Sequence, residues 1–220
     1  SIRAILITGA GDRVFSGGVD VRSPTAFTPA QRSEEFFRLL NAGLKSPKPV
    51  VAAVNGVASG GGMMLALSAD RVVAIESSSF ALPEIDLGSP TYAGMAMVSH
   101  LAGGGVSADI ALTGRRMSAR DAHAHGLVAE LVPDAELQAR AQAAALLAWT
   151  ESRAHHDPAK GALSSWTWLR MKGEIVDEIY TAFGQLDYAA DALHRLEAVM
   201  SGSATRGAAG EGLLARGLGQ

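Results

Sequence analysis

The 220-residue sequence contains no cysteine, so disulfide bonds, thiolate nucleophiles and cysteine-ligated metals are excluded within it. It also lacks an excess of positive charge, because 19 lysines and arginines stand against 22 aspartates and glutamates, for a net charge of −3. We therefore do not expect the basic surface of a nucleic-acid-binding protein.

Long apolar runs are missing as well. A helix that crosses a membrane needs about 20 consecutive apolar residues, and the longest apolar run, over residues 50–58, is interrupted by Asn55 and Gly56. The first residues lack the basic start and small-residue cleavage site of a signal peptide. We expect no membrane partner and a cytoplasmic location. Because the sequence opens directly on an apolar strand, we also expect the native protein to have further N-terminal residues.

With 48% hydrophobic and 19% charged residues, the composition is that of a globular protein. Apolar runs predict strands, helical spacing predicts helices, and a Gly/Ser/Pro-rich segment over residues 12–29 predicts a loop. The expected strands are 4–8, 50–54, 71–75, 79–82 and 127–133, and the expected helices are 29–44, 63–68, 94–101, 107–112, 118–126, 135–149 and 166–200. This alternation predicts βαβ units with a largely parallel sheet. We divide the chain into an α/β core, residues 1–133, and a mostly helical C-terminal region, residues 134–220.

Two glycine-rich stretches follow apolar segments: "FSGGVD" at residues 15–20 and "ASGGGMM" at residues 58–64. Glycines free the backbone N–H groups to point at a ligand, and two such groups from separate loops would stabilise charge on a carbonyl oxygen. The second stretch also opens a helix, whose N-terminus favours negative charge. The alternative is that both are tight, closely packed turns. A nucleotide phosphate loop is disfavoured because the lysine-bearing pattern and the dinucleotide spacing are both missing.

The stretch "ALPEIDLG", residues 81–88, places Glu84 and Asp86 among apolar residues. Burial among apolar groups raises the pKa of a carboxyl group and suits it to acid/base chemistry near neutral pH. If the stretch is extended, the two carboxylates share one side. The alternative is the solvated end of a surface strand.

The six histidines show no spacing that indicates a metal site. We expect solvated or interface side chains, and no metal, at His100, His123, His125, His155, His156 and His194.

Taken in order, "ILITGAGDRVFSGGVDV", "KPVVAAVNGVASGGGMMLALSADRVVAIESSSFALPEIDLG" and "LTGRRMSARDAHAHGLVAELVP" resemble the crotonase superfamily, the enoyl-CoA hydratase/isomerase group. The resemblance implies an α/β fold of stacked ββα turns in a spiral, followed by helices that build a homotrimer or hexamer. It also implies that the family's first segment, about forty-five residues with a strand pair and a helix, is missing here.

The resemblance further implies an acyl-CoA thioester substrate and no cofactor other than the coenzyme A of that substrate. Its oxyanion donors would be the N–H groups of Val19 and Gly61, with Glu84 as the catalytic acid/base. The remaining substrate-binding positions would be Gly18, Asp20, Gly60, Met64 and Tyr92.

The chain departs from the hydratase pattern at Met64, where hydratases of this family carry the first of two catalytic glutamates. A single carboxylate, Glu84, still suffices to move a double bond, so the pattern favours isomerisation over efficient hydration. Thr91 and Tyr92 occupy a region where some relatives have an acidic residue. The Tyr92 side chain either supplies a phenol to the pocket or packs as part of its wall. Asp86 is a further candidate partner of Glu84. The alternatives are a non-catalytic acyl-CoA-binding or assembly homologue, and a hydrolase that cleaves a C–C bond of a diketone.

Overall fold

The computed structural model describes residues 2–20, 29–89 and 91–154. The strands are β1 (Ile5–Thr8), β2 (Val14–Ser16), β3 (Val50–Val54), β4 (Val57–Ser59), β5 (Arg71–Ile75), β6 (Ser79–Ala81), β7 (Met117–Ser118) and β8 (Glu130–Val132). The α-helices are α1 (Pro29–Leu44), α2 (Gly61–Leu67), α3 (Tyr92–Ala102), α4 (Gly104–Thr113), α5 (Ala119–Ala124) and α6 (Leu137–Ala154), and the 3₁₀ helices are η1 (Pro83–Leu87) and η2 (Asp134–Glu136).

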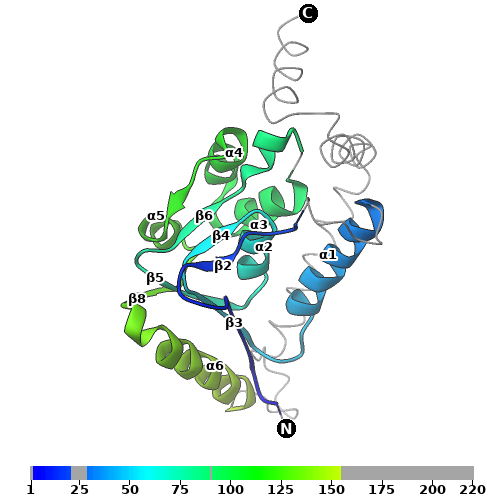
Figure 1. Ribbon diagram of the computed structural model, residues 1–220. Coiled ribbons are helices and arrows are strands. Elements are labelled where there is room, and N and C mark those ends of the chain that lie inside the picture. Colours follow the sequence, from blue (N-terminus) through cyan, green and yellow to red (C-terminus); the bar gives the residue numbers. More distant parts are fainter. Residues whose placement is uncertain (1, 21–28, 90, 155–220) are drawn as a thin grey trace, which may run out of the picture.

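The strands form two four-stranded sheets, ordered β1-β3-β5-β8 and β2-β4-β6-β7. Each consecutive strand pair, β1/β2, β3/β4 and β5/β6, places its first strand in one sheet and its second strand in the other. Neighbouring strands are parallel except for β6 and β7. The chain therefore advances by one strand in each sheet with every turn, which is a ββα spiral (Figure 1).

Strand β3 shows why the core forms where it does. All five of its residues are buried, as expected for the inner strand of a parallel sheet covered on both faces. Val51 and Ala53 pack in a cluster with Leu137 and Ala141 of α6. The alternate residues Ala52 and Val54 belong to a second buried cluster, whose helix residues include Leu40, Leu44, Met63 and Leu67. Figure 1 accordingly shows α6 at the lower left, away from α1 and α2.

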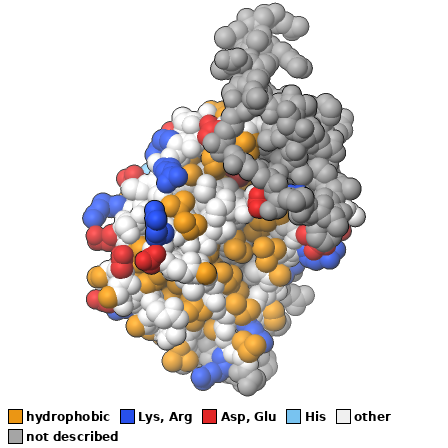
Figure 2. Space-filling model, viewed as in Figure 1, with side chains coloured by type: hydrophobic (Ala, Val, Ile, Leu, Met, Phe, Trp, Pro, Cys, Tyr) orange, Lys and Arg blue, Asp and Glu red, His pale blue; other side chains and the backbone are white. Residues whose placement is uncertain are grey.

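The edge strand β1 and helix α6 carry an apolar surface. Figure 2 shows hydrophobic side chains gathered over the lower part of the view, where Figure 1 places these two elements. Ile5 is exposed on β1, and Leu146 and Leu147 are exposed on α6. Contiguous exposed apolar surface of this kind is typical of an interaction site.

Most of the expected elements are confirmed. Helix α1 and strands β3 and β5 have the predicted bounds. The helix predicted from residue 118 is capped there, because Ser118 Oγ accepts a hydrogen bond from the Asp121 N–H at 3.1 Å. The loop expected over residues 12–29 is wrong at Val14–Ser16, which is β2, and β4 was not expected at all. Both strands have only three residues, too few to show a period in the sequence.

The predicted helical character after residue 134 is confirmed by η2 and α6 as far as residue 154. The helix predicted over residues 166–200 lies outside the described residues, and the proposed division at residue 133 stays a prediction. No helix within the described ranges is long and apolar enough to cross a membrane.

Candidate active site

The two glycine-rich stretches lie against each other where β2 and β4 end. A Cβ atom on Gly18 would lie 2.8 Å from the Ser59 carbonyl oxygen and 2.9 Å from the Gly61 nitrogen. A Cβ atom on Gly62 would lie 2.2 Å from the Ser16 carbonyl oxygen. These approaches are too close for any side chain, so the glycines are required for backbone to pack on backbone.

Two backbone N–H groups at this junction are unpaired. The Gly18 N–H donates to Ser16 Oγ at 3.2 Å, and the Gly60 N–H donates to the Ala81 carbonyl oxygen at 2.8 Å. The N–H groups of Val19 and Gly61 donate no hydrogen bond to any part of the chain that the structure describes. Two free donors therefore come from two loops in contact.

Two apolar side chains cover Gly61. A Cβ atom there would lie 3.0 Å from the Phe36 ring of α1 and 3.4 Å from Cγ2 of Val19. Phe36 is half-buried, whereas Val19 is 43% exposed. The Gly61 backbone is thus shielded on one side by an aromatic ring.

Glu84 reaches the same junction from a third segment. It lies in η1, which follows β6, begins at Pro83 and ends at Gly88 with φ +63. A Cβ atom on Gly60, which has φ +54, would lie 3.0 Å from Oε1 of Glu84. The Glu84 carboxyl group therefore sits directly against the triple glycine.

Among the described residues, no cation contributes to the environment of the Glu84 carboxyl group. Its Oε2 atom is buried without a hydrogen-bond partner among the described residues. Burial raises the pKa of Glu84 from its ordinary 4.5 to about 7, with its own backbone N–H and the nearby Thr91 hydroxyl acting in the opposite direction. The Thr91 hydroxyl oxygen is itself buried and has no hydrogen-bond partner within the part of the chain that the structure describes. At neutral pH this carboxyl group can both accept and release a proton.

Asp86 does not share this environment. The stretch is a 3₁₀ helix and not extended, so the condition under which Glu84 and Asp86 would share one side is not met. A 3₁₀ helix has about three residues per turn, which separates positions two apart around the axis. Asp86 is exposed to solvent.

The other expected site residues surround the junction at varying depth. Met64 is buried in the core within α2, and its N–H donates to the Gly60 carbonyl oxygen at 3.1 Å. Tyr92 is half-buried at the first residue of α3. Asp20 is exposed, and its carbonyl oxygen accepts a hydrogen bond from Arg32 of α1 at 2.8 Å. The contacts that join the site are those among Gly18, Val19, Gly60, Gly61 and Glu84.

Sequence reasoning missed two residues near this junction. Phe36 carries no sequence signal beyond its place in the predicted helix over residues 29–44, and Asn55 is visible in the sequence only as an interruption of an apolar run. Asn55 makes three hydrogen bonds to the turn that precedes β2. An asparagine followed by glycine between two strands was the available signal.

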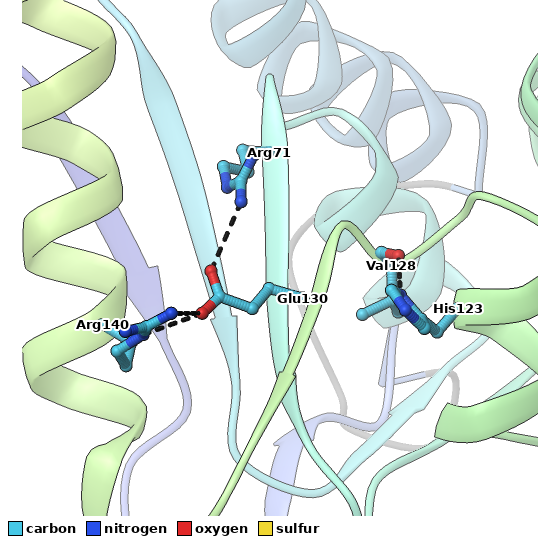
Figure 3. Close-up of polar contacts among 5 residues, drawn as sticks. All are labelled: Arg71, His123, Val128, Glu130 and Arg140. Carbon is cyan, nitrogen blue, oxygen red and sulfur yellow. Dashed lines mark hydrogen bonds and ion pairs between the residues drawn. The ribbon is translucent and has the colours of Figure 1, made fainter.

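A second carboxylate has the opposite environment. Figure 3 shows Glu130 of β8 between Arg71 of β5 and Arg140 of α6. Its Oε1 accepts from Arg140 Nε at 2.7 Å and its Oε2 from Arg71 at 3.3 Å. The hydrogen bonds from Arg140, with smaller ones from Arg71, lower the pKa of Glu130.

The same figure shows His123, whose Nδ1 lies 2.8 Å from the Val128 carbonyl oxygen. That contact ties α5 to the segment before β8. Among the described residues, no group of three His, Asp or Glu side chains could hold a metal ion.

Comparison with known proteins identifies the family. The sequence profile of the enoyl-CoA hydratase/isomerase family matches residues 1–178. A carnitinyl-CoA dehydratase from Salmonella typhi is 39% identical over 144 residues, which cover 64% of this chain and 55% of that protein. The chain thus spans about half the length of the curated relatives that it matches.

Solved structures share the fold. The carnitinyl-CoA dehydratase of Mycobacterium avium 104 is 30% identical with a TM-score of 0.61, over 91% of this chain and 73% of that one. Human mitochondrial delta3-delta2-enoyl-CoA isomerase has a TM-score of 0.68 at 18% identity, over 97% of this chain and 80% of that one, which is a likeness of fold alone. The chain belongs to the enoyl-CoA hydratase/isomerase family, and the expected crotonase-like α/β fold is confirmed.

Proposed function

We propose that this chain carries the active site of an enzyme that processes an acyl-CoA thioester through an enolate, with Glu84 as its single acid/base. The observation that carries the proposal is the position of Glu84: a buried carboxyl group with a pKa of about 7, set against Gly60 and next to two unpaired backbone N–H groups. A general acid/base works best when its pKa lies near the working pH.

In this mechanism the thioester oxygen accepts hydrogen bonds from the N–H groups of Val19 and Gly61. Glu84 removes a proton from the α-carbon, and the electron pair moves onto that oxygen as the enolate forms. Donors already in place at the position of the developing charge lower the barrier, and each is typically worth about 10²–10³ in rate. Coenzyme A enters as part of the substrate, alongside Gly18, Asp20, Gly60, Met64 and Tyr92.

The reaction that needs no second carboxylate is a shift of the double bond. Glu84 takes a proton from the α-carbon of a 3-enoyl-CoA and returns it to the γ-carbon, which leaves a 2-enoyl-CoA. No water is consumed and no atom is lost. Hydration adds a water molecule, and the thioether of Met64, buried in the core, has no proton to exchange. We therefore propose isomerisation as the favoured reaction, with hydration slow.

Dehydration of a 3-hydroxyacyl-CoA is the second candidate. It is favoured by relatives named carnitinyl-CoA dehydratases at 39% and 30% identity. The buried, unpaired oxygens of Glu84 and Thr91 offer polar partners for a departing hydroxyl group. Removal of the α-proton and loss of water would again pass through the enolate.

The deciding experiment measures the turnover of a 3-enoyl-CoA, a 2-enoyl-CoA and a 3-hydroxyacyl-CoA of the same chain length by the purified protein. The Glu84→Gln variant, assayed in the same way, gives the rate without the proposed acid/base. The expected result is fastest turnover of the 3-enoyl-CoA, with deuterium from D₂O entering the product. Fastest turnover of the 3-hydroxyacyl-CoA would instead establish the dehydratase.

Two results would overturn enolate chemistry on a thioester. Acyl-CoA binding without turnover or deuterium exchange would identify a binding or assembly homologue. Cleavage of a free diketone, with no turnover of any thioester, would identify a C–C hydrolase.

We also propose that the protein assembles as a homotrimer or hexamer in the cytoplasm, without a nucleic-acid or membrane partner. Family membership and the apolar surface over β1 and α6 support the assembly. Light scattering on the eluting protein measures its mass, and a monomeric mass would contradict the proposal.

A further inference from the structure

Asn55 lies at the corner between β3 and β4 and is 8% exposed. All three hydrogen bonds of its side chain reach the preceding corner, between β1 and β2. Oδ1 accepts from the Gly9 N–H at 3.0 Å, and Nδ2 donates to the carbonyl oxygens of Gly9 at 3.0 Å and Gly11 at 2.8 Å. An uncharged amide provides both donors and an acceptor, which a carboxylate or an apolar side chain cannot.

Backbone contacts hold the same two corners together. Gly56 has φ +152, and a Cβ atom there would lie 2.1 Å from the Arg13 carbonyl oxygen. That oxygen accepts a hydrogen bond from the Val57 N–H at 3.1 Å. The start of β2 is therefore held against the turn at Asn55 and Gly56.

The far end of β2 leads directly into the candidate site. The strand has only three residues, so its ends are about 7–10 Å apart. Beyond it, the Ser16 carbonyl oxygen rests on Gly62 and Gly18 rests on the Gly61 nitrogen. A displacement of the corner is transmitted along this short strand to Val19, three residues after Ser16.

We infer that Asn55 is a positioning residue that sets the place of the Val19 N–H relative to the Gly61 N–H. This inference rests on the proposed function, in which those two groups bind the thioester oxygen. Asn55 does not touch the substrate; it acts through β2. A misplacement of about 1 Å in such a site costs on the order of 10²-fold in rate.

The test compares Asn55→Ala and Asn55→Asp with a matched control, Ser78→Ala. The Ser78 hydroxyl is buried at the next corner, between β5 and β6, and donates to the Val54 carbonyl oxygen at 2.9 Å. The control therefore removes a buried bond between corners without touching the Gly9–Gly11 turn.

Two quantities separate positioning from general loss of stability. The first is kcat against KM for the acyl-CoA substrate. The second is the ratio of affinities for an acyl-CoA and for its thioether analogue, in which a methylene replaces the carbonyl. We expect the Asn55 variants to lose about 10–10²-fold in kcat, to keep KM nearly unchanged and to lose the preference for the carbonyl ligand. Ser78→Ala should retain the wild-type kcat and the preference for the carbonyl ligand.

The inference is overturned if the Asn55 variants keep the carbonyl preference, or if Ser78→Ala loses as much of it. Should Asn55→Ala fail to fold, Asn55→Asp decides, because it keeps the shape and the acceptor for Gly9. If the unaltered protein shows neither turnover nor a carbonyl preference, the proposed function itself has failed.

Discussion

Glu84 and Glu130 follow the same spiral but occupy opposite environments. Glu84 comes after β6 of one sheet, among glycines, with a buried oxygen that has no partner among the described residues. Glu130 lies on β8 of the other sheet and pairs with Arg71 and Arg140. Burial raises the pKa of Glu84 to about 7, whereas the arginines lower that of Glu130.

The difference shows how one residue type serves two purposes. Glu130 is paired with two arginines that lower its pKa, so it links β5, β8 and α6 as a carboxylate and has no proton to exchange near neutral pH. Glu84 has no cation beside it in the described part of the chain, and its burial costs stability once it ionises but gives it a pKa suited to proton transfer.

The largest expected effect comes from replacing each glutamate with glutamine. Glu84→Gln should lower kcat by about 10²–10⁴, because the amide cannot carry the proton, while acyl-CoA still binds. Glu130→Gln should leave turnover unchanged and lower only the thermal midpoint. Steady-state kinetics and acyl-CoA calorimetry on both variants measure this. Equal losses in the two variants would remove the functional distinction between the carboxylates.

Adding a methyl group at Gly62 tests the close packing of β2 against α2. Gly62→Ala places Cβ 2.2 Å from the Ser16 carbonyl oxygen, so β2 and α2 must separate, at a cost of about 1–3 kcal/mol or more. Gly105→Ala is the control, because this exposed glycine in α4 has no atom within 4 Å of the added Cβ. That change should raise stability by up to about 1 kcal/mol. Urea unfolding gives both values, and a neutral Gly62→Ala would contradict the backbone contact.

The raised pKa of Glu84 also predicts a pH-dependent stability difference. The unfolded chain ionises this group near pH 4.5 and the folded chain near pH 7, so the folded state binds the extra proton between these values. Wild-type stability relative to Glu84→Gln should therefore fall as the pH rises from 4.5 to 7, by about 3 kcal/mol in total, and level off above.

Urea unfolding of wild type and Glu84→Gln across pH 5–8 measures this difference. If the free energy of unfolding changes equally with pH in the two proteins, Glu84 does not have the raised pKa of a buried, unpaired carboxyl group. Glu130 provides the opposite sign, because its lowered pKa gives stability that is lost only as the pH falls through its folded-state pKa. That contribution is small, since its partners are largely exposed.

The smallest expected effect concerns Thr91. Its hydroxyl lowers the pKa of Glu84 against the larger effect of burial. In the wild type, kcat/KM should rise with pH through about 7 as the base ionises. Thr91→Val should move that midpoint to higher pH, and Thr91→Ser should restore it. The pH–rate profiles decide, and an unchanged or lower midpoint in Thr91→Val would show that the hydroxyl does not act on the carboxyl group.

Much of this architecture was predictable because its signals are local. Helix α1 and strands β3 and β5 follow from apolar periodicity within a single segment. Strands β2 and β4 did not, because three residues carry no period. They exist through pairing with each other, across more than forty residues, and through the pairing of β4 with β6.

Candidate site residues divide in the same way. Glu84 and the glycines were recognisable from their motifs. The place of Asp86 was left open, because the sequence did not distinguish an extended segment from a 3₁₀ helix. The Asn-Gly pair at Asn55 signals a turn, but nothing local shows that its side chain bonds to another turn 44–46 residues earlier.

By itself, the sequence determined the family, the helix and strand segments, and the residue types available for chemistry, since these depend on neighbours along the chain. Only the tertiary structure decided which of those residues meet. The contact of Glu84 with Gly60, the contact of Gly18 with Gly61, and the ion pairs that set Glu130 apart all join separate segments. Burial and charge, which set the two pKa values, exist only once those segments are packed.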